Sequence, residues 1–417
     1  MKQSGSADLA LMGGHIPTWL FERMTQLSRV VVEAIIEEYG KKAFLTKMAD
    51  PFWFQSFGAV IGMDWNSSGV TTAVMRALRK SLNPHSKALG IYVCGGKGKH
   101  SLKTPQELIR VGDQTGLDGH YLAECSKLSA KVDNTAIQDG FQLYIHNFVV
   151  SDEGDWTVVQ QGMKTEDKSA RRYHWHSGTL ASFVEEPHAA ICGENQGSIL
   201  NLVDKQARPT KEGILNILKE NPDKILKETQ RMVLPGYCAV KPKDVNFKRL
   251  GSVLWLAQEA QTTDFKDLLL LKGLGPRTLQ SLTLVSEVIH GTPSRFQDPA
   301  RFSFAHGGKT ARPFPVPTRV YDETIATLKT AVERAKMGNT DKQKAIAKLT
   351  TIAQKAEENF VPTEKDSNSL EKLMEKEKRD SWKYGGRTIE GYVKPPTKNQ
   401  NQEVNKNNKG GQLGLFD

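Results

Sequence analysis

The 417-residue sequence predicts an α+β fold that is mostly helical, with a small sheet containing a β-hairpin and a charged, largely disordered C-terminal tail. Apolar residues recur at three- and four-residue steps in long stretches, which indicates amphipathic helices. The period changes to two between residues 141 and 161, where the alternation indicates paired strands. Beyond residue 361 charged and amide side chains replace apolar ones, a composition that cannot bury a core.

These patterns predict three parts. Residues 1–205 are expected to form a mixed α/β body with the candidate active site. Residues 206–360 are expected to form a helical region that includes a helical hairpin at 264–290, and residues 361–417 form the tail. A chain of this length commonly holds two or three domains.

The body begins with helices. Residues 17–39 carry apolar side chains at helical spacing, and Gly40 stands where a C-cap belongs. The aromatic cluster at 51–57 is expected to lie in the core. Capping residues at 66–68 then open a helix that ends at Leu82, before a proline.

A loop of glycines and cations follows the first predicted strand. The strand at 90–94 runs into residues 95–100, which include Lys97 and Lys99, and a helix with a capping box starts at Thr104. A strand that is followed by a glycine-rich loop and the N-terminus of a helix favours binding of an anion. The Gly-Lys-Ser/Thr ending of a nucleotide-binding P-loop is absent, so a DNA phosphate is a better expectation than a nucleoside triphosphate. A plain surface turn explains the loop equally well.

The β-hairpin region is the stretch densest in acid–base and metal-binding side chains. Strands are predicted from Phe141 and at 156–161, and a third extended run at 171–176 places His174 and His176 on one side. The candidate catalytic residues are Asp139, Gln161, Arg171 and His174. Mg²⁺ or Mn²⁺ is the candidate cofactor, and its predicted ligands are Asp139, His146, His174 and His176.

The helical region contains predicted helices at 210–231 and 246–262 and then a hairpin of two helices, 265–271 and 278–290. Its turn has Gly273 and Gly275, which allow a tight bend, and Pro276, which suits a first helical turn. Such a turn directs free N–H groups and a helix dipole at one spot. The expected DNA-contacting residues there are Lys272, Gly273, Gly275, Arg277 and Thr278.

This turn resembles the helix-hairpin-helix motif of DNA repair and replication proteins, which grip the DNA backbone without reading sequence. An ordinary αα-corner is the alternative, but paired glycines with two flanking cations have no purpose in a plain corner. A second glycine–cation loop around Lys309 is a further expected DNA contact, together with Lys97 and Lys99.

The composition agrees with a nucleic-acid partner inside the cell. The formal net charge is +10 and the isoelectric point is about 9.2. An excess of basic residues favours a polyanion as the binding partner. The four cysteines are far apart in sequence and are expected to be reduced thiols. The sequence has no apolar run of membrane-span length and no signal-peptide core, so we expect a cytoplasmic, nucleoid-associated protein.

The tail ends in an apolar cluster that has no core to enter. Its sequence resembles the peptide by which bacterial polymerases and repair enzymes dock on the replication sliding clamp. Three apolar side chains would fill a pocket of the clamp, and a glutamine would add a hydrogen bond. The expected clamp-binding residues are Gln412, Leu413, Leu415 and Phe416.

Several motifs in the rest of the chain are similar to those of one family of archaeal and bacterial proteins, a domain of unknown function. The motifs include residues 13–15, 19–24, 50–55, 95–99, 138–140, 159–163, 171–175 and 303–309. The resemblance covers about residues 4 to 340 and implies no activity. It implies that body and hairpin form one unit to which the tail is an addition.

Three functions remain open. The first is a metal-dependent DNA nuclease tethered to the clamp, although Gln160 and Gln161 stand where a nuclease motif needs an acid. The second is a glycosylase-like base-excision enzyme with Asp298 as its catalytic acid, although Arg277 replaces the lysine of the lyase-type members. The third is a non-catalytic DNA-binding adaptor, which needs only the hairpin, the basic loops and the tail.

Overall fold

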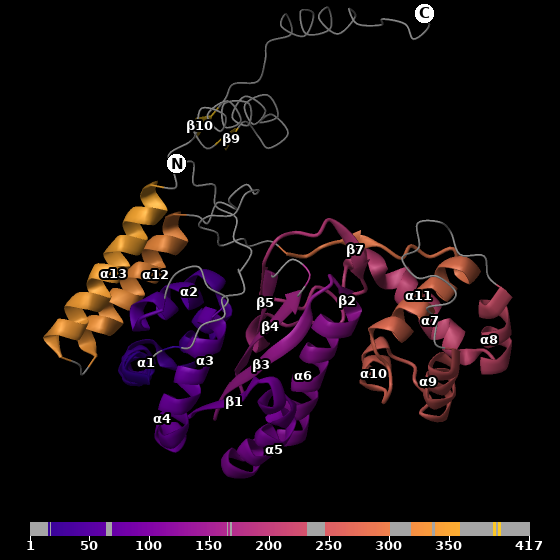
Figure 1. Ribbon diagram of the computed structural model, residues 1–417, viewed down its shortest axis with the longest axis horizontal. Coiled ribbons are helices and arrows are strands. Elements are labelled where there is room, and N and C mark those ends of the chain that lie inside the picture. Colours follow the sequence, from indigo (N-terminus) through magenta and orange to yellow (C-terminus); the bar gives the residue numbers. More distant parts are fainter. Residues whose placement is uncertain are drawn as a thin grey trace, which may run out of the picture. The chain divides into compact units, whose positions relative to one another are not determined.

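The computed structural model describes residues 16, 18–63, 69–164, 166, 169–231, 247–300, 318–335, 338–358, 387–388 and 391–392. The chain divides into two units, Met1–Gln354 and Lys355–Asp417. The first unit is mostly helical around a small antiparallel sheet, so the predicted α+β class is confirmed (Figure 1). In the second unit β9 (Arg387–Thr388) pairs antiparallel with β10 (Gly391–Tyr392).

A five-stranded antiparallel sheet forms the centre of the first unit. Its order is β1-β3-β4-β5-β6, and its strands are β1 (Ile91–Lys97), β3 (Gln142–Ser151), β4 (Trp156–Lys164), β5 (Ser169–His176) and β6 (Ala190–Cys192). The predicted hairpin is β3–β4, in which Val150 pairs with Trp156. A bulge between Leu143 and Ile145 shifts the register near the start of β3.

Both faces of this sheet are covered, which explains why strict polar–apolar alternation is weak in the strands. Tyr92 and Cys94 of β1 belong to one apolar core, and Ile91 and Val93 belong to the other. Because successive side chains of a strand point to opposite faces, a single strand contributes to both cores. The sheet therefore separates the side chains on one of its faces from those on the other.

Three helices cover one face (Figure 1): α1 (Thr18–Ala49), α2 (Pro51–Ile61) and α3 (Gly69–Leu82). The predicted end of the first helix at Gly40 is a kink instead, with φ of 84° there and helix on both sides. Asp50 caps α2 by accepting from the N–H of Trp53. The aromatic cluster of α2 is buried in the core, as predicted.

The opposite face is covered by α5 (Thr104–Thr115) and α6 (Gly119–Lys131). A π-helical turn, η3 (Val132–Ala136), follows α6 directly. Short elements join these helices to the sheet: η1 (Asn83–His85), α4 (Ser86–Leu89), η2 (Gly98–Lys103), η4 (Ser177–Thr179) and η5 (Lys205–Ala207).

A second, three-stranded sheet links the body to the helical region. Its order is β2-β7-β8, with β2 (Ile137–Gln138), β7 (Ser198–Asn201) and β8 (Phe296–Gln297). The helices of the region are α7 (Arg208–Lys219), α8 (Pro222–Arg231), α9 (Phe247–Glu259), α10 (Phe265–Leu270), α11 (Pro276–His290), α12 (Thr318–Arg334) and α13 (Asn339–Glu358). The single helix predicted at 210–231 is two, because Pro222 starts α8.

Three of the four cysteines, Cys94, Cys125 and Cys192, are free thiols buried in the core, while Cys238 lies outside the described residues. In the part of the chain that the structure describes, no helix is both long and apolar enough to span a membrane.

Candidate functional site

The turn between α10 and α11 leaves the start of α11 without a side-chain cap. Gly273 has φ of 90°, a conformation that favours glycine. Gly275 is extended, with φ of −136°, and occupies the N-cap position, where it has no side chain to accept from the helix. Pro276 follows at the first helical position. The N–H groups of the first turn and the positive end of the helix dipole therefore face outward.

A small pocket of about 260 Å³ lies at this helix start. Two guanidinium side chains line it: Arg277 belongs to α11, and Arg249 comes from the neighbouring α9. Both are exposed, while Thr278 and Ser281 at the pocket are buried. Positive charge from two helices thus converges where the helix dipole is also positive, which favours an anion.

Arg249 was missed from the sequence. It lies 24 residues before Gly273, and its Nε donates to the carbonyl oxygen of Gly273 at 3.0 Å. A Cβ built at Gly275 would lie 3.9 Å from its Nη2. The packing of α9 against the hairpin places Arg249 beside Gly273. No spacing pattern in the sequence predicts this contact.

The hairpin turn is held rigidly against the body. The Nζ of Lys131, at the end of α6, donates to the carbonyl of Leu274 at 2.6 Å. The Nε2 of Gln138, on β2, donates to the carbonyl of Pro276 at 2.8 Å. Leu274 itself is buried in the main core. A site with such supports keeps its geometry when a ligand arrives.

The predicted glycine–cation loop at residues 95–100 is built differently from an anion nest, because residues 95–97 belong to strand β1 and η2 begins at Gly98. The N–H of Gly95 donates to Oε2 of Glu107 at 2.8 Å, so a carboxylate of the protein already takes that position. Arg79 forms two hydrogen bonds to the same carboxylate, each 2.8 Å long. Lys97 and Lys99 are exposed beyond it, and the Nζ of Lys97 lies 5.6 Å from the ring centroid of Tyr144.

The sheet divides the four predicted catalytic residues between its two sides. Arg171 and Tyr173 of β5 lie on the side of Asp139, and Oδ2 of Asp139 accepts from both. His174 lies on the other side, where it contacts the ring of Phe54 in α2. Gln161 of β4 is also there, and its amide donates to the hydroxyl of Tyr144 at 2.5 Å. The four candidate catalytic residues therefore do not converge in one cleft.

Arg171 is the centre of a buried ionic cluster. It contacts Oδ2 of Asp139 at 2.8 Å and Oδ2 of Asp298 at 2.7 Å, and all three side chains are fully buried. Burial raises the pKa of Asp139, and the charge of Arg171 opposes that rise. Asp298, proposed from the sequence as a catalytic acid, is thus a structural partner that ties the segment after β8 to the sheet.

The four predicted metal ligands do not meet. His146 contacts Ser126 and Gln160, and His176 contacts Thr46 and Thr157. His174 accepts from Arg172 at 2.9 Å through Nε2, which leaves Nδ1 to donate to the carbonyl of Met48 at 3.1 Å. Burial lowers the pKa of each of the three imidazoles. Within the described ranges no group of three His, Cys, Asp or Glu side chains is placed to hold an ion.

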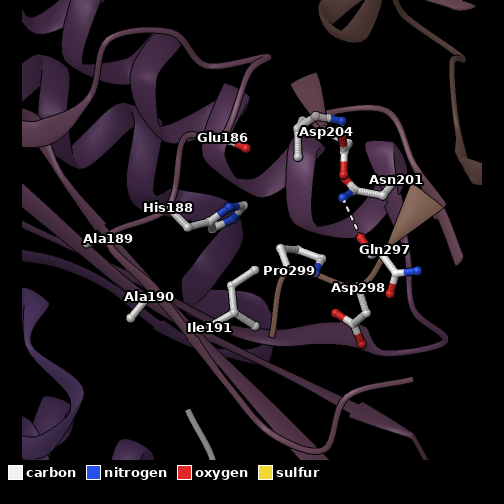
Figure 2. A pocket seen from close by; sticks show the side chains of 11 residues that line it. Glu186, His188, Ala189, Ala190, Ile191, Asn201, Asp204, Gln297, Asp298 and Pro299 are labelled. Carbon is white, nitrogen blue, oxygen red and sulfur yellow. Dashed lines mark hydrogen bonds between the residues drawn. The ribbon is translucent and has the colours of Figure 1, made fainter. Parts of the chain in front are cut away.

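A larger cavity, of about 360 Å³, lies beside β6 and the three-stranded sheet. Figure 2 shows the ring of His188 extending into it from the loop before β6. No sequence pattern selects His188, because its partner Asp133 is in a π-helical turn far away in the chain.

Two predicted sites lie outside the described residues. They are Lys309 of the second glycine–cation loop and the clamp-binding residues Gln412, Leu413, Leu415 and Phe416.

Comparison with known proteins gives one match. The family model described as "Protein of unknown function (DUF763)" matches residues 5–316, which include the sheet, the hairpin and both cavities. No curated protein matches the chain. No solved structure matches it either.

Proposed function

The chain belongs to the DUF763 family, and we propose that it is a DNA-binding protein that grips the sugar–phosphate backbone with the α10–α11 hairpin. One observation carries the proposal: the uncapped start of α11 opens on a pocket lined by Arg249 and Arg277. The family match covers the hairpin but gives it no activity.

The ligand class follows from the charges at the pocket. An anion there gains from the helix dipole, from N–H groups of the first turn and from two guanidinium groups. The pocket, of about 260 Å³, suits a group of phosphate size better than a large organic ligand. Exposed Lys272 extends the positive surface beside it.

A polymeric phosphate is favoured over a free one because the cations continue beyond the pocket. The whole chain carries a net charge of +10, and the exposed Lys97 and Lys99 offer a second region of contact. Contacts of this kind go to phosphates and position a duplex without selecting its sequence.

The tail is proposed to tether this body to the replication sliding clamp through residues 412–417. A flexible linker of roughly 20 residues spans about 25 Å, which would keep the body at high local concentration beside the encircled duplex. Deletion of residues 412–417 is expected to abolish capture by the purified clamp and to leave affinity for bare DNA unchanged. Undiminished capture of the truncated chain would remove the tether.

A metal-dependent nuclease remains a prediction, and the adaptor needs fewer assumptions. The adaptor requires only the hairpin and its cations, whereas the residues first predicted for catalysis lie on two sides of the sheet. Incubation with labelled flap, nicked and gapped DNA in Mg²⁺ or Mn²⁺ separates the two. Metal-dependent cleavage that copurifies with the protein would favour the nuclease, and its absence with every substrate would favour the adaptor.

The direct test of DNA binding is fluorescence anisotropy with labelled duplexes of two unrelated sequences. We expect similar affinities for both and a steep loss of affinity as salt rises. Failure to bind either duplex at low salt would overturn the proposal.

A further inference from the structure

His188 and Asp133 form a buried pair at the edge of the larger cavity. The Nε2 of His188 lies 2.5 Å from Oδ1 of Asp133. The other oxygen of Asp133, Oδ2, accepts from the indole N–H of Trp175 at 2.9 Å and from the amide of Gln160. These donors occupy Oδ2 and fix the carboxylate, so Nε2–H of His188 donates to Oδ1 and the other ring nitrogen, Nδ1, is left for another partner.

The imidazole is held in one orientation by the rings around it. Its centroid lies 4.4 Å from that of Trp175, at an interplanar angle of 60°, and 6.2 Å from that of Tyr173. The side chain is only 6% exposed. Among the described residues none hydrogen-bonds Nδ1, while the ring lines the cavity (Figure 2). A side chain that lines the cavity thus has one ring nitrogen with no partner among the described residues.

The lining of the cavity disfavours an anionic ligand. Polar side chains of Glu186, Asn201, Asp204 and Gln297 line it, and Ile191 and Pro299 supply apolar surface. None of the described lining residues is lysine or arginine. The carboxylates repel phosphate and carboxylate ligands, whereas amide and carboxylate oxygens accept from amino groups.

One acid at the cavity is already neutralised and one is only partly so. Asp298 gives both of its oxygens to Arg171. Glu186 contacts Lys205 at 2.7 Å in an exposed ion pair. Such a pair contributes little to stability and leaves the carboxylate accessible to a ligand. Acceptors for a ligand are thus Glu186, Asp204 and Nδ1 of His188.

We propose that this cavity binds a free nucleobase or nucleoside, a neutral planar heterocycle that carries amino groups. The volume of about 360 Å³ lies at the lower end of the range for small-molecule sites. Ile191 and Pro299 contact the ring, while Glu186, Asp204 and His188 accept from its N–H groups. The proposal is independent of DNA binding, because the ligand lacks the phosphate that the hairpin recognises.

Isothermal titration of the full chain with adenine, cytosine and guanosine tests the proposal. We expect one-to-one saturable binding of at least one of them and much weaker binding of adenosine monophosphate, whose phosphate meets carboxylates. Absence of saturable binding with all three, or tighter binding of the alkyl diamine putrescine than of any base, would overturn it.

Variants locate the binding. Glu186→Gln and Asp204→Asn each remove a charge and keep the shape, and we expect about tenfold weaker binding from loss of a charged acceptor. Glu185→Gln is the matched control, since Glu185 pairs with Arg208 and does not line the cavity. His188→Asn should abolish binding while far-ultraviolet circular dichroism stays unchanged.

If His188→Asn does not fold, the two acid variants decide. Wild-type affinity in both of them would contradict the assignment of the cavity. A variant that lacks the guanidinium groups of Arg249 and Arg277 should bind the base as the wild type does, so loss of DNA binding and loss of base binding can be told apart.

Discussion

The Nε of Arg249 donates to the carbonyl oxygen of Gly273 at 3.0 Å, and this bond joins α9 to the tightest point of the α10–α11 turn. It fixes one end of the Arg249 guanidinium, whose remaining nitrogens lie at the pocket before α11. The same arginine supports the turn and supplies charge for an anion. The positive charge of Arg249 also acts on Lys131: burial, and then this charge, lower the pKa of the Lys131 amine.

Replacing Arg249 by alanine should weaken duplex binding by about tenfold, because a charge-assisted contact contributes roughly 1.5 kcal/mol. The loss should be the same for duplexes of unrelated sequence, as expected for a phosphate contact. Arg249→Lys keeps the charge without the planar fork and should bind with intermediate affinity. Anisotropy titrations measure all three proteins. A loss confined to one sequence would instead indicate base recognition.

The two glycines of the turn should respond differently to alanine. Gly273 has φ of 90°, so Gly273→Ala should lower the free energy of unfolding by about 1–2 kcal/mol. Gly275 has an ordinary extended conformation, and its new Cβ would meet nothing closer than 3.9 Å, so Gly275→Ala should be nearly neutral. Urea denaturation compares them. Equal losses would mean that the turn is not shaped as described.

The buried ionic cluster should be important for stability. Asp298→Ala leaves the fully buried Arg171 with one carboxylate partner instead of two, and loss of about 3–5 kcal/mol is expected. Arg208→Ala breaks an exposed pair with Glu185 and should leave the free energy of unfolding almost unchanged. Denaturant unfolding measures both. A small effect of Asp298→Ala would show that Asp298 is dispensable for the fold.

Acid should destabilise the protein through its buried histidines. Burial, and then the charge of Arg172, lower the pKa of His174 well below its usual range. The unfolded chain therefore binds more protons than the folded one as the pH falls below about 6.5, so stability declines by up to about 1.4 kcal/mol per pH unit for each such group. His174→Gln should reduce this slope between pH 7 and pH 5. An unchanged slope would contradict a neutral His174.

The sequence identified the parts of the fold that depend on local pattern. The β3–β4 hairpin, α9, and the glycine turn before α11 all follow from periodicity and turn residues. The two-sided burial of β5 did not follow, because eight consecutive buried residues that include two arginines and two histidines resemble an active site in sequence. In the structure these side chains have separate partners on the two faces of the sheet: Arg171 pairs with Asp139 and Asp298, and Arg172 bonds His174.

Partners far apart in the chain were the main source of error. Arg171 pairs with Asp298, and His188 pairs with Asp133. The partners of each pair lie far apart in the chain, so a single sequence does not reveal either contact. Arg249 is similar, since α9 alone looks like any amphipathic helix. Density of polar residues along a strand therefore predicted the wrong cleft, whereas local glycine geometry predicted the shape of the hairpin turn.

The salt dependence of duplex binding tests the central proposal most directly. In a plot of the logarithm of the affinity against that of the salt concentration, each phosphate contact contributes about 0.9 to the slope. The double variant Arg249→Ala/Arg277→Ala should therefore have a slope shallower by about 2, while the control Arg208→Ala, which removes one exposed cation outside the hairpin, should keep the wild-type slope. A double variant that retains the wild-type slope and affinity would contradict backbone gripping by the hairpin.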